Sequence, residues 1–451
     1  MSVNFKGGNR KQQYLFPPSV EDWLPADHLA RFVVEIVGQL DISSIISEYG
    51  GRGSKAYDPA MMTALLFYGY ATGVFSSRKI ERSTYDSVAF RYIAGNTHPD
   101  HDTIATFRRR FLPHLKGIFV QILQIAHEMN ILRLGAVSLD GTKVKANASK
   151  HKALSYGHAS KLEKQLEQEI NELLQKAEQT DNADLPDGMS IPEEISRREE
   201  RLVSIRKAKA EIESRAAKRN AEENKAYKEK MAQREAKEKK TGKKPPGKPP
   251  QPPTAGPSNK DQVNLTDDES RIMPVSGGGF DQCYNAQAGV DAASQLIVCS
   301  RVSQKPNDKK EMKPAIEELQ SLNPGLGAVS ALLADNGYFS NDNCTIIERA
   351  GITPYVAVGR EKHNTRLEDR FSDPPPLTEG ADHKTTMQHR LKTKVGKALY
   401  AARKSTVEPV FGIIKHVLGF RQFSFRGVER VQGEWDLVTI AWNLKRMHVL
   451  A

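Results

Sequence analysis

A long run of helix-forming sequence interrupts an alternating pattern of strands and helices in this chain of 451 residues. Within residues 155–240, apolar side chains recur at helical spacing in two stripes, one around Leu166 and one around Ile205. The turn-rich segment between the stripes, Asp181 to Pro192, predicts that the two helices fold back on each other as an antiparallel hairpin or coiled coil. A domain that contains this insertion must therefore be assembled from segments on both sides of it.

The sequence on either side of the insertion predicts one mixed sheet. Before it, an apolar run from Gly135 ends at Asp140 and is followed by Gly141, a pattern typical of a buried strand with a carboxylate at its end. After it, residues 284–358 predict a strand hairpin, a helix, a strand ending at Asp335, a helix and a strand. One strand before the insertion and four after it predict an α/β fold, a mixed five-stranded sheet with helices in the RNase H-like order.

Changes in composition along the chain predict five segments. The first is all-α, because its apolar residues recur at spacings of three and four, and the fourth is a Pro-rich basic linker that cannot bury a core and should be flexible. In the last segment, Arg360 to Lys394 is expected to form a long loop before two C-terminal helices. The predicted segments are a helical domain at 1–130, the first part of the sheet domain at 131–154, the helical insertion at 155–240, the linker at 241–262 and the rest of the sheet domain at 263–451.

Composition limits the partners and the compartment. The chain has 66 Lys and Arg against 55 Asp and Glu, and its formal charge of +11 favours a polyanion as partner. Its three cysteines show no CxxC spacing, which argues against a zinc ribbon or a disulfide framework and fits a reducing compartment. No apolar run reaches the roughly 18 residues that span a bilayer, and the N-terminus is polar. We therefore expect a cytoplasmic protein with no membrane partner.

A strongly basic helical turn lies in the N-terminal segment. Asp102 to Phe107 place a polar cap in front of a helix whose next turn contains Arg108, Arg109 and Arg110. A recognition helix of a helix-turn-helix presents cations to DNA in this way. The solvated face of an ordinary helical bundle would give the same pattern, so the residues alone leave both interpretations open.

Two aspartates indicate the chemistry of the sheet domain. Asp140 and Asp335 each end a predicted strand, and the first and fourth strands of this topology are neighbours, so the two carboxylates should meet at one edge. Two carboxylates that lie so near each other repel unless a cation lies between them. Mg²⁺ prefers such oxygen ligands. Two divalent ions about 3.5 to 4 Å apart can hold the attacking and leaving oxygens of a phosphoryl transfer. A single Asp at a strand end is more often a turn former, so the argument depends on the pair.

The third carboxylate allows two interpretations. Glu408 lies at the edge of an apolar helix stripe, seven residues before Lys415, which would place an acid and a cation near one face. Alternatively, Ser405 and Glu408 fit the S-x-x-E pattern of a capping box, and Pro409 suits a first helical turn. In that case Glu408 would only satisfy backbone donors at a helix start.

Four sequence blocks carry a more specific signal. They are SLDGTKVKANASKHKALSYG (Ser138 to Gly157), DESRIM with YNAQAGVD (Asp268 to Met273 and Tyr284 to Asp291), LLADNGYFS (Leu332 to Ser340) and VEPVFGIIKHVLGFRQFSFRG (Val407 to Gly427). In this order they resemble the catalytic blocks of Asp-Asp-Glu (DDE), RNase H-like insertion-sequence transposases. More narrowly, they resemble the IS-eleven-eighty-two group, which carries a helical insertion between the first two strands. ALLFYGYATGVFSSRKIER (Ala64 to Arg82) is similar to that group's N-terminal DNA-binding domain, so the resemblance covers nearly the whole chain.

The resemblance implies a catalytic triad and a reaction. Asp140, Asp335 and Glu408 match the three acids of the family, which bind Mg²⁺, with Mn²⁺ tolerated. The implied enzyme is a polynucleotidyl transferase that binds the terminal inverted repeats of its element, cleaves the DNA strands and transfers them to a target. Its partners would be double-stranded DNA and a second copy of the chain, in a bacterial cytoplasm on the nucleoid.

The last block departs from the family in one respect. Related transposases carry a tyrosine, arginine, glutamate and lysine signature on the last catalytic helix. Glu408 and Lys415 keep the spacing, whereas Tyr400 and Arg403 fall one residue upstream and Lys404 stands where the arginine is expected. We therefore expect Lys404, with Arg403 as the alternative, and Lys415 to contact the DNA backbone beside the scissile bond.

Two other functions remain compatible with these residues. One is a non-catalytic DNA-binding protein derived from a transposase, against which the intact triad argues. The other is a metal-dependent nuclease without strand transfer, which would use the same triad. Inverted repeats in the DNA that flanks the reading frame would identify a mobile element.

Overall fold

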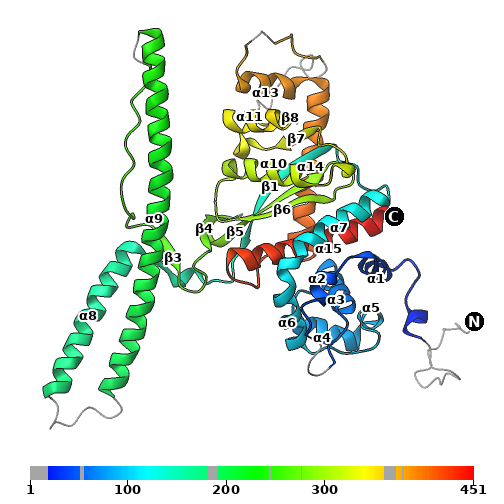
Figure 1. Ribbon diagram of the computed structural model, residues 1–451, viewed down its shortest axis with the longest axis horizontal. Helices are drawn as coiled ribbons and strands as arrows, with labels where there is room; N and C mark the ends of the chain where they lie inside the picture. Colours follow the sequence, from blue (N-terminus) through cyan, green and yellow to red (C-terminus); the bar gives the residue numbers. More distant parts are fainter. Residues whose placement is uncertain are drawn as a thin grey trace, which may run out of the picture. The chain divides into compact units, whose positions relative to one another are not determined.

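A computed structural model describes residues 19–50, 55–179, 190–242, 245–275, 277–359, 372–377 and 380–451. The chain divides into two compact units, unit 1 with Met1–Val144 and Asn285–Ala451 and unit 2 with Lys145–Tyr284 (Figure 1). Residues 181–189 of the predicted turn and 360–371 of the predicted loop lie outside the described residues. No helix of the described ranges is long and apolar enough to cross a membrane.

Within the described residues the mixed sheet has six strands, one more than predicted: β4 (Arg271–Pro274) and the five strands that the sequence predicts. The predicted five are β1 (Ala136–Lys145), β5 (Phe280–Asp291), β6 (Ile297–Ser303), β7 (Ala331–Ala334) and β8 (Thr353–Val356). Their order in space is β6-β5-β1-β7-β8, with β5 and β6 antiparallel and β1, β7 and β8 parallel. This is the RNase H-like order, so the predicted fold class is confirmed.

The first strand is longer than predicted. β1 does not end at Asp140 but continues to Lys145, so this aspartate lies inside the strand and not at its tip. The apolar run stops at Gly141, but Val144 is buried and prolongs the strand pattern on one face. β7 does end directly before Asp335, as predicted.

Helices pack on both sides of this sheet. They are η4 (Asp308–Glu311), α10 (Met312–Ser321), η5 (Pro324–Leu326), η6 (Asn336–Tyr338), α11 (Asn341–Arg349), α13 (His383–Lys392), α14 (Lys394–Gly412), the π-helix η7 (Ile413–Val417) and α15 (Val428–Leu450). α13 lies in the segment predicted as a loop, so that part of the prediction is wrong. Its only buried residues are Met387 and Leu391, too few for a recognisable apolar stripe, and the Asp382 side chain caps it by accepting a hydrogen bond from the Thr385 N–H.

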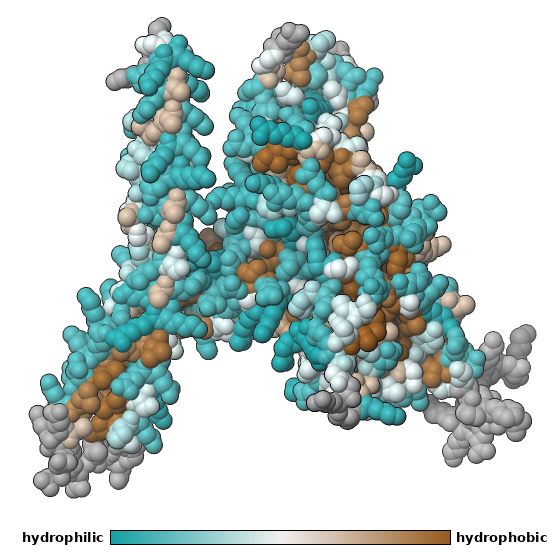
Figure 2. Space-filling view, viewed as in Figure 1, coloured by the Kyte–Doolittle hydropathy of each residue, from teal (hydrophilic) through white to brown (hydrophobic). Residues whose placement is uncertain are grey.

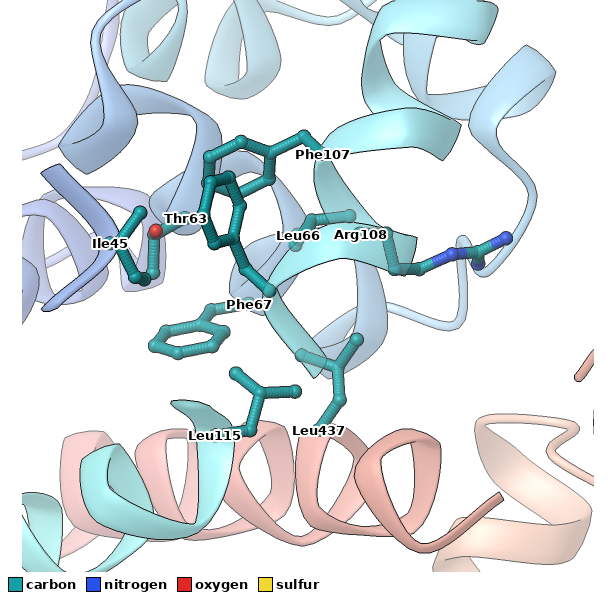
Figure 3. A pocket seen from close by; sticks show the side chains of 9 residues that line it. Ile45, Thr63, Leu66, Phe67, Phe107, Arg108, Leu115 and Leu437 are labelled. Carbon is teal, nitrogen blue, oxygen red and sulfur yellow. The ribbon is translucent and has the colours of Figure 1, made fainter. Parts of the chain in front are cut away.

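The N-terminal region is all-α, as predicted. Its elements are η1 (Val20–Trp23), α1 (Leu29–Gln39), α2 (Ser43–Ile46), α3 (Pro59–Ala71), α4 (Ser77–Asp86), α5 (Val88–Ile93), α6 (His101–Phe111), η2 (Leu112–His114) and α7 (Leu115–Glu128). α15 packs against α3, α7 and β6, so the N-terminal helices and the sheet share one core and are not separate compact units. Several of these helices and α15 enclose a small, mainly apolar cavity of about 10 Å³ (Figure 3).

Unit 2 contains the predicted helical hairpin. Its elements are η3 (Lys150–Lys152), β2 (Ala153–Ser155), α8 (Tyr156–Gln179), α9 (Ile191–Thr241), β3 (Gln262–Asn264) and β4 (Arg271–Pro274). β2 pairs with β3, and β4 pairs with the first residues of β5. α8 packs along the first part of α9 over an apolar core that includes Leu166, Ile170, Ile205 and Ile212. Among the described residues, no helix packs in this way on the remainder of α9, and its surface is mostly hydrophilic (Figure 2).

Candidate active site

The register of the two central parallel strands brings Asp140 and Asp335 together. The last paired residues of β1 and β7 are Leu139 and Ala334, and the next residue along each chain is one of the aspartates. Residues at the same level of neighbouring parallel strands face the same side of the sheet. The sequence-based pairing of these two carboxylates is therefore reproduced in the fold, although one lies within its strand.

Each aspartate has one carboxylate oxygen fixed by the backbone. Asp140 Oδ1 accepts the N–H of Gly141 at 2.8 Å, and Asp335 Oδ1 accepts the N–H of Gly337 at 2.8 Å. Asp335 is thus also the cap of η6, so its turn-forming role and its place at the site coexist. The Oδ1 bonds orient both side chains and leave their Oδ2 atoms for other partners.

The capping-box interpretation of Glu408 is wrong. α14 begins at Lys394 after the N-cap Thr393, so Ser405 and Glu408 lie well inside the helix. Pro409 lacks an N–H, and the Ser405 carbonyl that would have accepted it accepts instead from Gln295 Nε2 at 3.1 Å. The chain therefore continues as a helix through the proline, and Glu408 keeps a half-exposed side chain available for another role.

Arg403 joins the acids of different elements. Its Nη1 lies 3.4 Å from Asp140 Oδ2, and its Nη2 lies 3.3 Å from Glu408 Oε1. The residue is only 9% exposed, and its guanidinium lies 5.8 Å from the ring centroid of Tyr400. Glu408 is thereby connected to Asp140 through a shared cation.

The pKa shifts show how the three acids and the arginine act on one another. Burial, with a smaller contribution from the charges of Asp335 and Asp308, raises the pKa of Asp140 to about 6, although the Gly141 N–H and Arg403 lower it. Burial lowers the pKa of Arg403, but the charges of Asp140, Asp335 and Glu408 outweigh burial and raise it. The site is therefore a partly dehydrated group of negative charges that needs a cation.

Sequence reasoning missed a fourth acid beside this group. Asp308, the first residue of η4, accepts hydrogen bonds at Oδ1 from Asn285 Nδ2 at 2.6 Å and Gln287 Nε2 at 2.8 Å. Lys143 Nζ lies 3.4 Å from the same oxygen. The signal in the sequence was the pair of uncharged polar residues, Asn285 and Gln287, at alternate positions among the apolar residues from Tyr284 to Val290.

Gly141 is required for this arrangement. A Cβ at Gly141 would lie 2.1 Å from Gln287 Nε2, 2.8 Å from Asp308 Oδ1 and 2.9 Å from Asn285 Oδ1. Real side chains do not approach that closely, so only glycine allows β1 to run beneath the Asp308 cluster. Asn285 Oδ1 is buried and has no hydrogen-bond partner among the described residues.

Tyr338 and an open pocket complete the surroundings. The Tyr338 hydroxyl donates to Gln287 Oε1, and burial, followed by the charges of Asp308, Asp140 and Asp335, raises the pKa of this tyrosine well above its usual value. A pocket of about 410 Å³ lies between the start of η4 and the residues that follow Asp335. It is lined by Pro306, Asn307, Asp308, Lys309, Asn336, Gly337 and Phe339.

The two lysines expected to contact DNA differ in their surroundings. Lys404, the favoured candidate, is exposed, whereas the alternative Arg403 faces the carboxylates. Lys415 lies in the π-helix η7 and donates from Nζ to the Lys143 carbonyl on β1 at 2.8 Å. Arg403 and Lys415 thus both lie near β1, and Lys404 projects to solvent.

The three arginines of α6 are also not equivalent. Arg108 donates to the Tyr70 hydroxyl at 3.0 Å and to the Phe75 carbonyl at 2.8 Å, and its side chain extends away from the small cavity (Figure 3). Arg110 forms an ion pair with Glu48 at 2.8 Å. Arg109 is exposed and pairs with no described residue. Of the three, Arg109 has the side chain most available to a nucleic acid.

The carboxylates fit a divalent metal by their chemistry. DDE transposase domains use divalent metal ions, and hard oxygen ligands are what Mg²⁺ and Mn²⁺ prefer. The oxygens of the two aspartates that the backbone does not hold, together with Glu408, are such ligands. As the side chains are placed, with Arg403 between Asp140 and Glu408, no three His, Cys, Asp or Glu residues of the described ranges are close enough to hold one ion.

Comparisons with known families match two parts of the chain. Residues 18–110 match the family described as Transposase domain (DUF772), and residues 255–444 match the Transposase DDE domain. No curated protein and no solved structure gives a significant match. The second range contains Asp335 and Glu408, whereas Asp140 lies before it, on the far side of the helical insertion.

These matches and the RNase H-like sheet define a DNA transposase with a polynucleotidyl transferase domain. The chain belongs to the DDE transposases of insertion sequences, so the predicted family, activity and DNA substrate are confirmed.

Proposed function

We propose that Asp140, Asp335 and Glu408 are the metal-binding catalytic acids of this transposase, and that it cleaves DNA at the ends of its element and joins them to a target. The observation that carries the proposal is the β1–β7 register, which places the two aspartates at one level. Glu408, on α14, shares the Arg403 guanidinium with Asp140 and so belongs to the same site.

The proposed chemistry divides the work between the metal and the chain. Two divalent ions, with Mg²⁺ as the usual ion and Mn²⁺ accepted, would activate the attacking oxygen and neutralise the leaving oxygen. The Gly141 and Gly337 N–H groups orient the aspartates. Lys415, held against β1, would place a positive charge beside a scissile phosphate.

The matched N-terminal domain is proposed to bind the terminal inverted repeats. The exposed Arg109 on α6 supports this role, while Arg108 and Arg110 are engaged within the protein. Replacing Arg109 by Ala should lower affinity for end DNA and reduce the dependence of affinity on salt by about one counterion. The corresponding Arg108→Ala change should instead lower stability, because Arg108 is bonded to Tyr70 and Phe75.

The part of α9 beyond the hairpin core is proposed to hold DNA or a second copy of the chain. Residues 217–241 contain nine basic and five acidic side chains and are mostly exposed. Arg234 donates to the carbonyls of Pro245 and Gly247, which keeps part of the linker against this helix. Deleting this extension and measuring the pairing of two DNA ends would test the role.

We further propose that the protein acts as a homodimer on DNA, belongs to the IS-eleven-eighty-two group and works on the nucleoid in the cytoplasm. All three proposals rest on the resemblance of the sequence blocks.

A single assay separates this function from its alternatives. The substrate is duplex DNA that carries the inverted repeats flanking the reading frame, with a supercoiled target plasmid and Mg²⁺. The transposase should produce both cleaved ends and joined products. Cleavage without joining would indicate a nuclease, and binding without cleavage would indicate a non-catalytic DNA-binding protein.

A further inference from the structure

The guanidinium of Arg403 lies where a metal bound by Asp140 and Glu408 would have to bind. It bridges oxygens of both carboxylates, at 3.4 Å and 3.3 Å, and the charge of Asp335 acts on it as well. One positive charge thus serves all three acids of the proposed triad. A metal ligated by Asp140 Oδ2 and Glu408 Oε1 would need the same lone pairs that this guanidinium uses.

The position of Arg403 in its helix shows that this contact is built into the fold. Arg403 occupies the buried stripe of α14, with Val407 four residues and Val410 seven residues further on. A charged side chain is rarely buried at such a position unless it is paired. Its Nε atom is buried and has no hydrogen-bond partner among the described residues, so the two carboxylates are its main compensation.

We infer that Arg403 is the counter-cation of the metal-free site and that a divalent ion must displace its guanidinium from Asp140 and Glu408 in order to bind. This inference rests on the proposed function, because it needs those carboxylates to be metal ligands. Arg403 is a positioning residue here. It prevents repulsion among the acids before metal arrives and competes with the metal for the same oxygens.

Displacement also provides a link to the DNA substrate. A guanidinium released from carboxylates binds a phosphate through the same paired N–H donors. Arg403 can therefore exchange the carboxylates for a phosphate of the bound end, which favours metal loading after DNA has bound. Metal affinity in the absence of DNA should accordingly be held below the value that the carboxylates alone would give.

The test measures Mn²⁺ affinity of the full-length chain without DNA, by calorimetric titration at a pH of about 8. Arg403→Gln should bind Mn²⁺ about tenfold more tightly than the wild type, because the competing cation is gone. Arg403→Lys should lie between the two, since it keeps a charge but cannot bridge both acids. Lys404→Gln removes the same charge from the next, exposed residue and should change affinity less than about twofold.

A thermal measurement gives a second readout that does not depend on turnover. Without metal, Arg403→Gln should melt below the wild type, because its acids repel each other, and Mg²⁺ should raise its Tm more than it raises the wild-type Tm. Equal or weaker Mn²⁺ binding by the Gln and Lys variants of Arg403 would overturn the inference. If the double variant Asp140→Asn, Glu408→Gln binds Mn²⁺ as the wild type does, the proposed metal site itself is wrong.

Discussion

Two groups of acids in unit 1, one buried and one partly exposed, differ in their hydrogen bonding. In the first group, α15 presents Glu434 and Asp436 to the N-terminal helices and to β6. Glu434 accepts from the N–H groups of Ser424 and Phe425 at 2.8 Å and 3.2 Å, and from the hydroxyls of Ser424 and Tyr70. Both of its oxygens therefore accept hydrogen bonds from groups of the folded chain.

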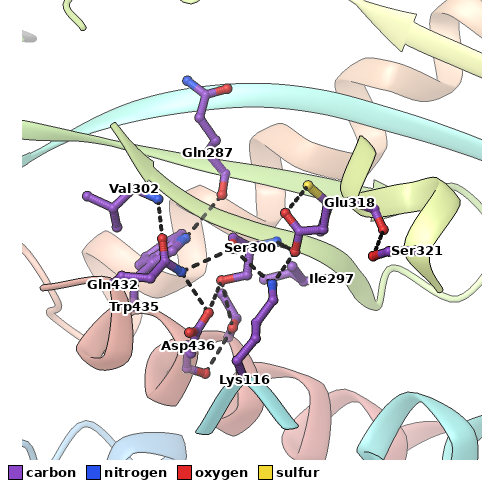
Figure 4. A network of polar contacts seen from close by, with 12 residues as sticks. Lys116, Gln287, Ile297, Ser300, Val302, Glu318, Ser321, Gln432, Trp435 and Asp436 are labelled. Atoms are coloured by element: carbon purple, nitrogen blue, oxygen red, sulfur yellow. Dashed lines mark hydrogen bonds and ion pairs between the residues drawn. The ribbon is translucent and has the colours of Figure 1, made fainter. Parts of the chain in front are cut away.

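Asp436 is likewise held by side chains of the fold (Figure 4). Its Oδ1 accepts from Ser300 Oγ at 2.8 Å and from Gln432 Nε2 at 2.9 Å. Glu318 on α10 pairs with Lys116 and accepts the Ser300 N–H at 3.1 Å. These side chains satisfy the edge of β6 that does not pair with β5, so the acids hold helices against a strand that would otherwise have an open edge.

The second group is the proposed catalytic site, where the acids are not fully satisfied. Asp140 and Asp335 each use one oxygen to accept a backbone N–H, and the charges that remain act on the single guanidinium of Arg403. Buried acids with complete hydrogen bonding stabilise a fold, whereas acids that share too few donors retain the capacity to bind a ligand. The two groups can therefore be separated by mutation.

The largest contrast is expected for isosteric removal of charge. Glu408→Gln, Asp140→Asn and Asp335→Asn should each lower the rate of strand cleavage by about a thousandfold or more, because a metal ligand is lost, with end binding nearly unchanged. Glu434→Gln is the matched control and should cleave at a rate close to the wild type. The rates are measured on labelled end DNA in Mg²⁺. Wild-type cleavage by Glu408→Gln would show that the third ligand lies elsewhere.

The reverse contrast concerns stability. Glu434→Ala should lower the free energy of unfolding by about 3 kcal/mol, because it leaves the buried donors of Ser424, Phe425 and Tyr70 without an acceptor. Glu408→Ala should cost less than about 1 kcal/mol, since that side chain is half exposed. Urea unfolding at constant pH compares the two variants. Equal losses would mean that satisfaction of hydrogen bonds does not distinguish the two groups of acids.

Asp308 has features of both groups and provides an intermediate case. It is held by Asn285 and Gln287, as a structural acid would be, yet its charge acts on Asp140. Asp308→Asn keeps the shape and should slow cleavage about tenfold while leaving the Tm within about 2 °C. A shift of the pH–rate profile to lower pH should accompany the loss, because the Asp308 charge raises the pKa of Asp140. An unchanged profile would limit Asp308 to packing.

The sequence predicted the pairing of the two aspartates but not the cation, Arg403, that joins Asp140 to Glu408. Apolar runs that end at acids identify buried strands, and the fold order then makes the first and fourth strands neighbours, so Asp140 and Asp335 could be found. The spacing of the signature favoured Lys404 over Arg403. In the structure Lys404 is exposed, whereas Arg403 lies on the apolar stripe of α14 that faces the sheet. The signal for the buried cation was therefore present in the sequence, as a charged residue, Arg403, at an apolar position of the helix.

Other features depend on contacts that no local pattern encodes. Glu408 fits a capping box by its neighbours, and only the helix that starts fourteen residues before it, at Lys394, excludes this role. Glu434 lies on the second predicted C-terminal helix, and its sequence neighbours do not show whether it is a structural acid or a metal ligand. Its partners Tyr70 and Ser424 come from distant segments, so its structural role appears only after folding.

The smallest expected effect concerns Asp436 and tests whether the charge of a buried, hydrogen-bonded acid still lowers the stability of the fold. Burial raises the pKa of Asp436 to about 6, against the opposing effects of Lys116, Ser300 and Gln432. The folded state therefore holds the proton of the Asp436 carboxyl more tightly than the unfolded chain does, so the charged form lowers the stability of the fold. This loss of stability grows as pH rises from the ordinary aspartate pKa through the folded value. Asp436→Asn removes the titration and keeps an acceptor for Ser300 and Gln432. The difference in free energy of unfolding, variant minus wild type, should therefore increase by roughly 1 kcal/mol between about pH 5 and about pH 8. Urea unfolding at both pH values measures it, and a difference that stays constant or decreases would show that the Asp436 network compensates its charge completely.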